Sequence, residues 1–536
     1  MRLVFSLLLC AAASGAAQAP GTARAKVADA CVPPPGGTAP SLPAKLLEGQ
    51  GSTPFRITTK SAEAQKFFDQ GVAQMHSFWA REAERSFLQA AELDPEAPMP
   101  HWGIAMVAVG DYRPRFQLAG EPTNRPLSPR VKKAVEKALE LSAVPGKATE
   151  LEKMYIAAIA ARRDPKAKDQ DEAFVKALRA LVARYPDEVE ARTYLTLMIM
   201  RGFVLPNKTP RYETSMEAAA MLRQLLKDAP DHPGVHHYVI HGFEGSTFAK
   251  DAWLSCKRYA ELVTNIPHAL HMPGHIWAQT GRWDDAVKSF DNAAVNERSY
   301  MKADSLYGNY HHAHNVHFLA TSYSFRGDYD KAIEASRELI AMTENPREAK
   351  ALENTRTAHA QGWFALMGAM VQFRKWGQIL AGELPKPDKP RLLAWYHWAR
   401  GVALANKENA SAAMTEAALM KSAIEAHRRA NDGKVLPPVQ VAAKELEGHI
   451  NIARKKVDKG LKQIAKASAA ERKLVYNEPP SYPRPASEGL GHWALRHGRT
   501  GVAEQAFKEA LAQYPADHHA ESALRALGAK PTAAGL

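Results

Sequence analysis

Apolar residues recur every three to four positions along most of the chain, and this spacing predicts one amphipathic helix after another. Three segments share the pattern A-x3-F-x2-A, which places its small and aromatic residues on a single helical face. The pattern occurs at Ala83–Ala90, at Ala286–Ala293 and at Ala503–Ala510. Alanine allows a partner helix to approach closely, and phenylalanine fills the space beside it. β-Branched runs are rare, so the pattern predicts an all-α chain.

Residues that end a helix follow two of these segments, Leu93–Pro95 in one case and Tyr514–Pro515 in the other. A further copy begins at Gly327 and has Ala332 in the place of the first alanine. Such helix–turn–helix units of about 34 residues resemble the tetratricopeptide repeat. The resemblance recurs from about residue 60 to about residue 527. We therefore predict an all-α, tetratricopeptide-like helix-pair solenoid, a right-handed superhelix with a concave groove.

Proline- and glycine-rich stretches divide the chain into the expected domains. Residues 20–55 contain CVPPPGGTAPSLPAK and are predicted to be a linker. Residues 56–383 are predicted to hold the N-terminal and central repeats with a histidine-rich groove. Residues 384–536 are predicted to hold the C-terminal repeats, because a proline-rich loop follows Glu383.

The first 19 residues are typical of a secretory signal peptide, with Arg2, the apolar run Leu3–Ala13 and small residues before Pro20. We expect export to the periplasm or cell envelope. A lipid anchor on Cys10 is the alternative to a soluble form. No later stretch approaches the 18 apolar residues that a membrane helix needs, so no integral membrane segment is expected after cleavage.

The chain has a net charge of +13, with 24% charged residues. Its Lys and Arg residues are scattered along the helix patterns, which indicates a solvated basic surface, and together with export this argues against a nucleic-acid partner. After cleavage only Cys31 and Cys256 remain, so no disulfide framework is expected.

Histidines are concentrated in one part of the chain, because 11 of the 21 lie between His232 and His317. They also follow the repeat register. His237 and His271 are 34 residues apart, as are His241 and His275. The next unit is 46 residues long, an offset that relates His271 to His317 and His268 to His314. The register predicts that His237, His271 and His317 occupy one position on three stacked first helices, which line the groove.

Imidazoles from neighbouring helices can converge on a metal ion, and an H-x3-H pair on one helix already supplies two ligands. The candidate metal ligands are His237, His241, His271, His275, His314 and His317. An imidazole-dominated site suits Zn, Cu, Fe or Ni, whereas Ca and Mg prefer oxygen ligands. Candidate catalytic residues are Glu244 or Glu478 as a general base and Tyr310 as a group that orients an oxyanion or takes part in redox chemistry. Proline at position 273 raises the question whether the helix starts or kinks between His271 and His275.

One further pair lies several repeats away. Aligning Ala503 with Ala286 places Glu488 and His492 where His271 and His275 stand. This spacing makes them a candidate E-x3-H pair facing the same groove.

Several motifs together resemble one bacterial family of exported or envelope-associated tetratricopeptide-like proteins of largely undefined function. The matching runs cover roughly residues 67 to 485. The motifs are H-x3-H-x2-E (His237, His241, Glu244), H-M-P-x-H (His271–His275), H-N-x-H-F (His314–Phe318) and N-E-P-P (Asn477–Pro480). The family often carries an N-H-E turn in its first repeat, where this chain reads WAREAE, so a first-repeat histidine site is not expected here.

Three functions remain open at this stage. The first is an exported metal-dependent enzyme, hydrolytic or oxidative. The second is a metal storage or delivery protein, and the third is a protein–protein interaction scaffold whose groove binds a peptide, protein or small molecule. Whether the protein is an enzyme stays undecided by the sequence, since the fold does not determine the function.

Overall fold

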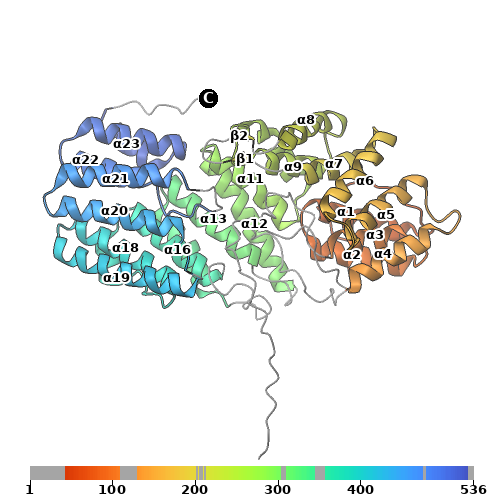
Figure 1. Ribbon diagram of the computed structural model, residues 1–536, viewed down its shortest axis with the longest axis horizontal. Coiled ribbons are helices and arrows are strands. Elements are labelled where there is room, and N and C mark those ends of the chain that lie inside the picture. The colour runs from red at the N-terminus through yellow and green to blue at the C-terminus, as the bar shows by residue number, and fades with distance from the viewer. Residues whose placement is uncertain are drawn as a thin grey trace, which may run out of the picture.

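The computed structural model describes residues 43–108, 129–200, 203–204, 209–210, 213–303, 310–343, 357–431, 433–474 and 479–528. In these ranges the chain is helical apart from turns and one hairpin of two short strands, β1 (Phe203–Val204) and β2 (Thr209–Pro210). Consecutive helices pack as antiparallel pairs and the pairs stack side by side (Figure 1). The predicted all-α helix-pair solenoid is confirmed. The predicted signal peptide and residues 20–42 of the predicted linker lie outside the described residues.

The helices fall into three consecutive groups. The N-terminal group comprises α1 (Ala62–His76), α2 (Ala80–Leu93), α3 (Met99–Val107), α4 (Pro129–Ser142), α5 (Glu150–Arg163), α6 (Gln170–Arg184), α7 (Val189–Ile199) and α8 (Glu213–Asp228). The central group comprises α9 (Pro233–Phe243), η1 (Ala249–Ala252), α10 (Trp253–Leu262), α11 (Pro267–Gln279), α12 (Trp283–Ala303), α13 (Tyr310–Arg326) and α14 (Tyr329–Ala341). The C-terminal group comprises α16 (Ala358–Gln372), α17 (Trp376–Ala381), α18 (Pro390–Asn406), α19 (Ala410–Ala430), α20 (Pro437–Ala453), α21 (Val457–Glu471), α22 (Ala486–Arg496), α23 (Thr500–Gln513) and α24 (His518–Ala526).

The phenylalanine of the repeat pattern packs against a glycine of the preceding helix. A Cβ atom at Gly274 in α11 would lie 2.4 Å from the Phe290 ring of α12. Gly71 with Phe87 and Gly491 with Phe507 form the same contact in other units. Only a residue without a side chain permits this close approach of the two helices.

The turn between the paired helices also has a common form. One residue takes a positive φ, and the residue after it donates its N–H to the carbonyl five positions back, as in a Schellman cap. Arg282 N–H donates to Trp277 O at 2.8 Å after Gly281, and Lys375 N–H donates to Met370 O at 2.9 Å after Arg374. At other turns the positive-φ residue is Phe78, Glu408 or Lys455, although glycine adopts this conformation with less strain.

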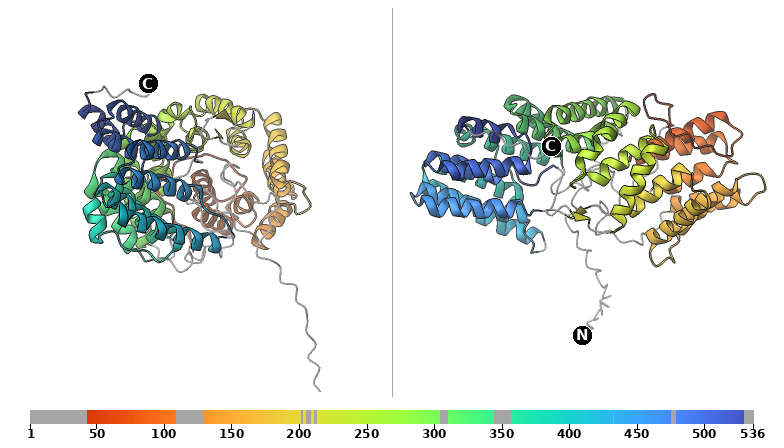
Figure 2. Two further views of the ribbon diagram at one scale, coloured as in Figure 1. Left: turned by 60° about the vertical axis from the view of Figure 1, so that its left-hand side comes forward. Right: turned by 90° about the horizontal axis from the view of Figure 1, so that it is seen from above.

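The stacked pairs contact one another across long sequence separations. Helix α1 packs against α9, and the Tyr259 hydroxyl of α10 lies 3.0 Å from the Ser77 hydroxyl. At the other end, Trp283 Nε1 donates to Pro515 O at 2.9 Å, and helix α24 contacts α13. The C-terminal helices therefore return to the middle of the chain, as two further views show (Figure 2).

Residues 43–55 form an extended strap, although the sequence predicts a linker there. Gln50 Nε2 donates to Asn265 O at 2.6 Å, and Gly49 O accepts the N–H of Asn265 at 2.9 Å. Phe55 is buried in the first hydrophobic core. The strap thus joins α1 to the turn between α10 and α11.

Three large hydrophobic clusters succeed one another along the chain. The first extends from Phe55 to Leu319, the second from Ala332 to Ala486 and the third from Ile452 to Leu524. The second cluster crosses residue 383, where the sequence predicts the boundary between two sets of repeats. Among the described residues, no helix is both long and apolar enough to cross a membrane.

One buried carboxyl group makes the stability of the fold depend on pH. Glu471 at the end of α21 is 3% exposed, and burial raises its pKa from 4.5 to about 7. Its Oε1 accepts a hydrogen bond from Gln513 Nε2 at 2.6 Å. The folded state holds the proton of Glu471 more tightly than the unfolded chain does. The resulting contribution to the free energy of unfolding is fully present below pH 4.5 and is lost as the pH rises through about 7.

We expect Glu471→Gln to keep the hydrogen bond without the ionisable group. The variant should be more stable than the wild type at pH 8 by up to about 3 kcal/mol and nearly equal to it at pH 4.5. Thermal unfolding of both proteins at the two pH values measures the difference. Glu425→Gln, at a partly exposed position of α19 where Glu425 pairs with Arg428, is the control and should show no such gain. A Glu471→Gln protein with the wild-type pH profile would contradict the assignment.

Candidate metal centre

The histidine-rich helices α9, α11 and α13 are the first helices of three consecutive units. Helix α9 begins at Pro233 after His232, whose Nδ1 accepts the N–H of Val235 at 3.2 Å as an N-cap. Helix α11 begins at Pro267 and continues through Pro273 to Gln279. The internal proline therefore neither starts nor ends the helix, and His271 and His275 lie one turn apart on it.

Six histidines form two groups of three. The first triad consists of His237 and His241 of α9 with His268 of α11, and the second triad consists of His271 and His275 of α11 with His314 of α13. In each triad one ring nitrogen from each histidine lies within 4.8 Å of the other two. All six side chains are buried, and none is more than 4% exposed.

The second triad is the first triad displaced by one repeat. The pair on one helix moves by 34 residues, from His237 and His241 to His271 and His275. The single histidine of the next helix moves by 46 residues, from His268 to His314. The next unit does not contain a third histidine pair, since the residue 46 positions after His275 is Thr321.

The structure brings together five of the six predicted metal ligands. His317 lies outside both triads, and its ring packs 6.1 Å from the Phe364 ring. His268 takes its place, although the sequence analysis did not include it among the ligands. The sequence feature that could have identified His268 as a ligand is its 46-residue offset from His314, which was a predicted ligand. The sequence predicts that these histidines line a concave groove, and in the structure the side chains of both triads are buried between the first helices.

The predicted catalytic residues differ in how the structure places them. Glu244, at the C-terminus of α9, contacts both triads. The side chain of Tyr310 and the whole of Glu478 lie outside the described residues. Glu488 and His492 stand apart from both triads, where Gln372 Nε2 donates to Glu488 Oε1 at 3.3 Å and Arg374 contacts His492.

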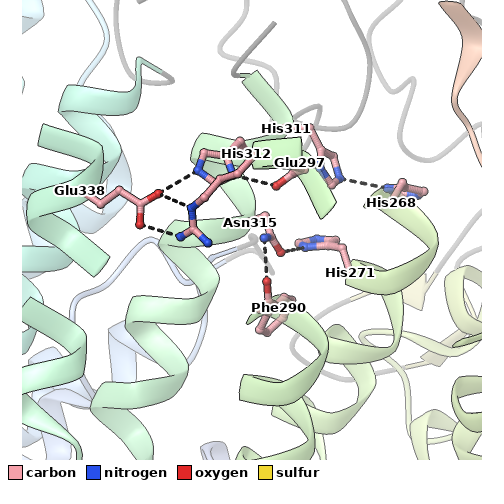
Figure 3. A network of polar contacts seen from close by, with 9 residues as sticks. His268, His271, Phe290, Glu297, His311, His312, Asn315 and Glu338 are labelled. Atoms are coloured by element: carbon pink, nitrogen blue, oxygen red, sulfur yellow. Dashed lines mark hydrogen bonds and ion pairs between the residues drawn. The ribbon is translucent and has the colours of Figure 1, made fainter. Parts of the chain in front are cut away.

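The hydrogen bonds around the second triad determine which ring nitrogens carry protons. Asn315 Nδ2 donates to Phe290 O at 2.8 Å, so its Oδ1 faces His271 and accepts from His271 Nδ1 at 2.8 Å (Figure 3). His275 Nδ1 donates to Glu244 Oε2 at 3.1 Å. Each neutral ring then has a lone pair on Nε2. These two Nε2 atoms lie 2.6 Å apart.

The first triad follows the same rule. His237 Nδ1 donates to the carbonyl of His76, and His241 Nδ1 donates to Glu244 Oε1 at 3.1 Å. His268 Nδ1 lies 3.3 Å from His311 Nε2, while His311 Nδ1 donates to the Glu297 carboxylate. His311 can therefore accept from His268, which leaves a lone pair on His268 Nε2. That atom lies 3.1 Å from His237 Nε2.

Two lone pairs at such distances repel each other unless a cation lies between them. Burial lowers the pKa values of His237, His268 and His271 well below their usual range, and the neighbouring histidines lower them further. These three rings are therefore neutral at pH 7. Neutral imidazole is the form that binds a metal ion.

A carboxylate links the two triads. Glu244 Oε1 accepts from His241 of the first triad and Oε2 accepts from His275 of the second. A carboxylate that holds the outer nitrogen of a histidine orients its ring and makes the inner nitrogen a stronger donor to a metal. Glu244 therefore acts on both triads as a positioning residue.

A chain of charged groups leads from the first triad toward the surface (Figure 3). Glu297 accepts from His311 with one oxygen and from His312 Nδ1 with the other, at 3.0 Å for His312. His312 Nε2 then contacts Glu338 at 3.0 Å, and Arg298 pairs with Glu338 at 2.7 Å. Burial would raise the pKa of Glu297, but the two histidines lower it to about 2. Glu297 thus stays ionised and holds His311 in the tautomer that the first triad requires.

A third buried cluster differs from the triads because it is satisfied without a cation. Glu190 accepts from His76 Nε2 at 2.7 Å and from His232 Nε2 at 2.9 Å. The Tyr238 hydroxyl lies 3.0 Å from His76 Nδ1, and Val235 N–H donates to His232 Nδ1. Each ring nitrogen faces a group of complementary type. Because the His76 side chain is held in this cluster, the cluster also fixes the His76 carbonyl, which accepts from His237 Nδ1.

Aromatic rings close around the triads. The Phe78 ring lies 4.4 Å from the ring of His237 and stacks on that of His241 at 5.1 Å. The Phe318 ring lies 4.8 Å from that of His275 and 5.2 Å from that of His314. Phe78 holds this place with a φ of 54°, a strained conformation for a bulky residue. These rings surround the imidazoles with apolar surface, which lowers the local dielectric constant and strengthens electrostatic interactions there.

No family model matches this chain, and no curated protein matches it. Among solved structures, the chain is similar to yeast Tom70, with 13% identity, a TM-score of 0.27, and coverage of 87% of this chain and 90% of that one. It is also similar to the human IFIT1 dimer with m7Gppp-AAAA, with 12% identity, a TM-score of 0.31, and coverage of 88% and 89%. The APC/C hetero-tetramer Cut9-Hcn1 gives 12% identity, a TM-score of 0.27, and coverage of 87% and 90%. Because these scores are low, the fold assignment rests on the stacked helix pairs themselves, and no function is transferred.

We expect Asn315→Leu to weaken metal binding at the second triad alone. The change removes the acceptor that holds the proton on His271 Nδ1, and loss of such a partner costs about 10- to 100-fold in metal affinity. Titration with Co²⁺, followed by its visible absorption, should show one weakened site and one unchanged site. Asn451→Leu in α20 is the control and should leave both sites unchanged. Equal weakening of the two sites would contradict the assignment of Asn315 to the second triad.

Proposed function

We propose that this protein binds two transition-metal ions, one in each triad. The observation that carries the proposal is the 2.6 Å separation of His271 Nε2 and His275 Nε2, whose Nδ1 atoms both donate to oxygen acceptors. The repulsion between their lone pairs is relieved by a shared proton or by a metal ion. A shared proton engages only two of the three rings, whereas a metal ion uses all three.

The donor set supports an ion of the later first-row metals. Each triad offers three neutral nitrogen donors and no oxygen ligand, which suits Zn, Cu or Fe and disfavours Ca and Mg. Three protein ligands leave a coordination position open for water or substrate, as in catalytic zinc sites. Structural sites are usually closed by four protein ligands.

The open positions favour a metal-dependent enzyme of the hydrolytic or oxidative class. In such an enzyme the chain's own groups orient the ligands, because Glu244, Asn315 and the His76 carbonyl hold the outer nitrogens. The burial of all six histidines favours the second candidate, a protein that stores or delivers metal. Export to the periplasm or cell envelope is part of the proposal and is supported by the signal-like sequence of residues 1–19.

Metal content tests the proposal directly. Protein purified without an affinity tag should contain two equivalents of Zn, Cu or Fe by plasma mass spectrometry. His241→Ala should abolish the first site and His275→Ala the second, so each variant should keep about one equivalent, because loss of one of three ligands removes most of the affinity. The double variant should contain none.

The control is His397→Ala, since His397 is a buried histidine whose Nδ1 pairs with Glu416 at 2.6 Å, in a separate part of the fold. It should retain both equivalents. If the wild type takes up no metal even after reconstitution, the proposal is wrong. If metal is bound, its identity selects the assays, hydrolytic for Zn and oxidative for Cu or Fe, and loading without turnover in either would favour storage or delivery.

A further inference from the structure

A second site lies in the C-terminal repeats, in a small pocket that is partly open to solvent. Helices α16, α18, α20 and α22 and the turn before α17 surround it. It includes Glu488 and His492, the pair that the repeat register relates to His271 and His275. The enclosed space is about the size of one water molecule, so a ligand would place only a compact polar group in it.

The pocket offers hydrogen-bond donors that no carboxylate of the described residues pairs with. The Arg374 guanidinium makes no ion pair with any carboxylate in the described ranges, and its Nη1 donates to His492 Nδ1 at 3.0 Å. The Trp376 indole N–H is buried and has no acceptor among the described residues. A buried donor left unpaired is costly, so an acceptor supplied by a ligand would be favoured.

The charges of the pocket are unbalanced in the positive direction. Burial lowers the pKa of Arg374, and the nearby Arg496 lowers it further, which indicates two guanidinium groups without a carboxylate between them. Burial together with Asp517 raises the pKa of Glu488 well above its usual range, so Glu488 is neutral and its neighbour Asp517, with a pKa of about 6, holds the one negative charge of this pair.

The other ionisable groups of the pocket add no negative charge. Arg484 is paired with Glu445 at 2.8 Å, and burial lowers the pKa of His492 to about 3. Arg496 also donates to Asn406 O at the C-terminus of α18, at 3.2 Å, which offsets the negative end of that helix.

We infer that this pocket binds a small organic anion, whose carboxylate or phosphate group pairs with Arg374 and accepts the indole N–H of Trp376. Val371, Val402 and Trp493 line the inner side of the pocket and are buried, so the rest of the molecule would lie outside it, beside the exposed Arg374. This site is independent of the two histidine triads.

The backbone conformation at Arg374 allows a test variant that should not destabilise the fold. Arg374 has a φ of 55° at a turn where other repeats have glycine, such as Gly281 and Gly498. Arg374→Gly therefore removes the guanidinium and relieves strain at the same time. Its melting temperature should equal or exceed that of the wild type.

Calorimetric titration with inorganic phosphate and with succinate tests the inference. The wild type should bind at least one of them saturably, and Arg374→Gly should weaken that binding by about 10-fold or more, since a charge-assisted hydrogen bond is lost. Trp376→Phe keeps the ring without the donor and should weaken binding several-fold. Arg525→Gln, at an exposed position of α24, should bind like the wild type.

The pair of probes also identifies the ligand class, since tighter phosphate binding indicates a phosphorylated ligand and tighter succinate binding a carboxylate. The titration is repeated with the His241→Ala/His275→Ala protein, which should bind the anion normally if the pocket, and not a metal ion, is the site. Absence of saturable binding of both probes below about 10 mM, or wild-type affinity in Arg374→Gly and Trp376→Phe, would overturn the inference.

Discussion

The close contact between Gly274 and Phe290 is the constraint on which the centre of this structure depends. It brings α12 against α11 at the point where His271 and His275 flank the glycine, and the Phe290 ring lies 5.0 Å from the ring of His271. One repeat earlier the sizes are exchanged, because the corresponding positions are Ile240 and Cys256, both buried. The larger side chain of the pair thus lies on the first helix instead of the second, and the combined size of the two side chains changes little.

On this rigid frame, the positions of protons decide what the histidines can do. Oxygen acceptors or an acceptor imidazole hold the outer nitrogens of five triad histidines, so that their inner nitrogens point lone pairs at one another. In the cluster of His76, Glu190 and His232 the acceptor stands in the middle instead, and the donors point inward. Two arrangements of similar residues therefore have opposite electrostatic character, one suited to a cation and the other already complete.

Much of the fold and part of the centre could be predicted from the sequence. The spacing of Ala286, Phe290 and Ala293 identifies the second helix of a pair, and the 34-residue offset identifies the histidines that share a position. Periodicity does not tell which neighbouring helix a side chain faces, and for this reason His268 was not predicted as a ligand while His317 was. The contacts of Gln50 with Asn265 and of Trp283 with Pro515 join residues more than 200 positions apart. No local sequence pattern encodes contacts between residues so far apart. The sequence therefore could not predict that the histidines of the expected groove are buried.

The unequal lengths of the repeats carry a consequence for how this protein can evolve. The unit that is 12 residues longer than its predecessor has a second helix, α12, that continues beyond the length of α10, and the added part contains Glu297. A longer second helix thus contributes a carboxylate that accepts from His311, while the spacing of His271 and His275 within α11 is unchanged. A single deletion inside α11, by contrast, would rotate the residues after it by about 100° and separate the two histidines that share its second triad. A second helix can thereby change in length at its end, whereas the residue count between the paired histidines of a first helix is fixed.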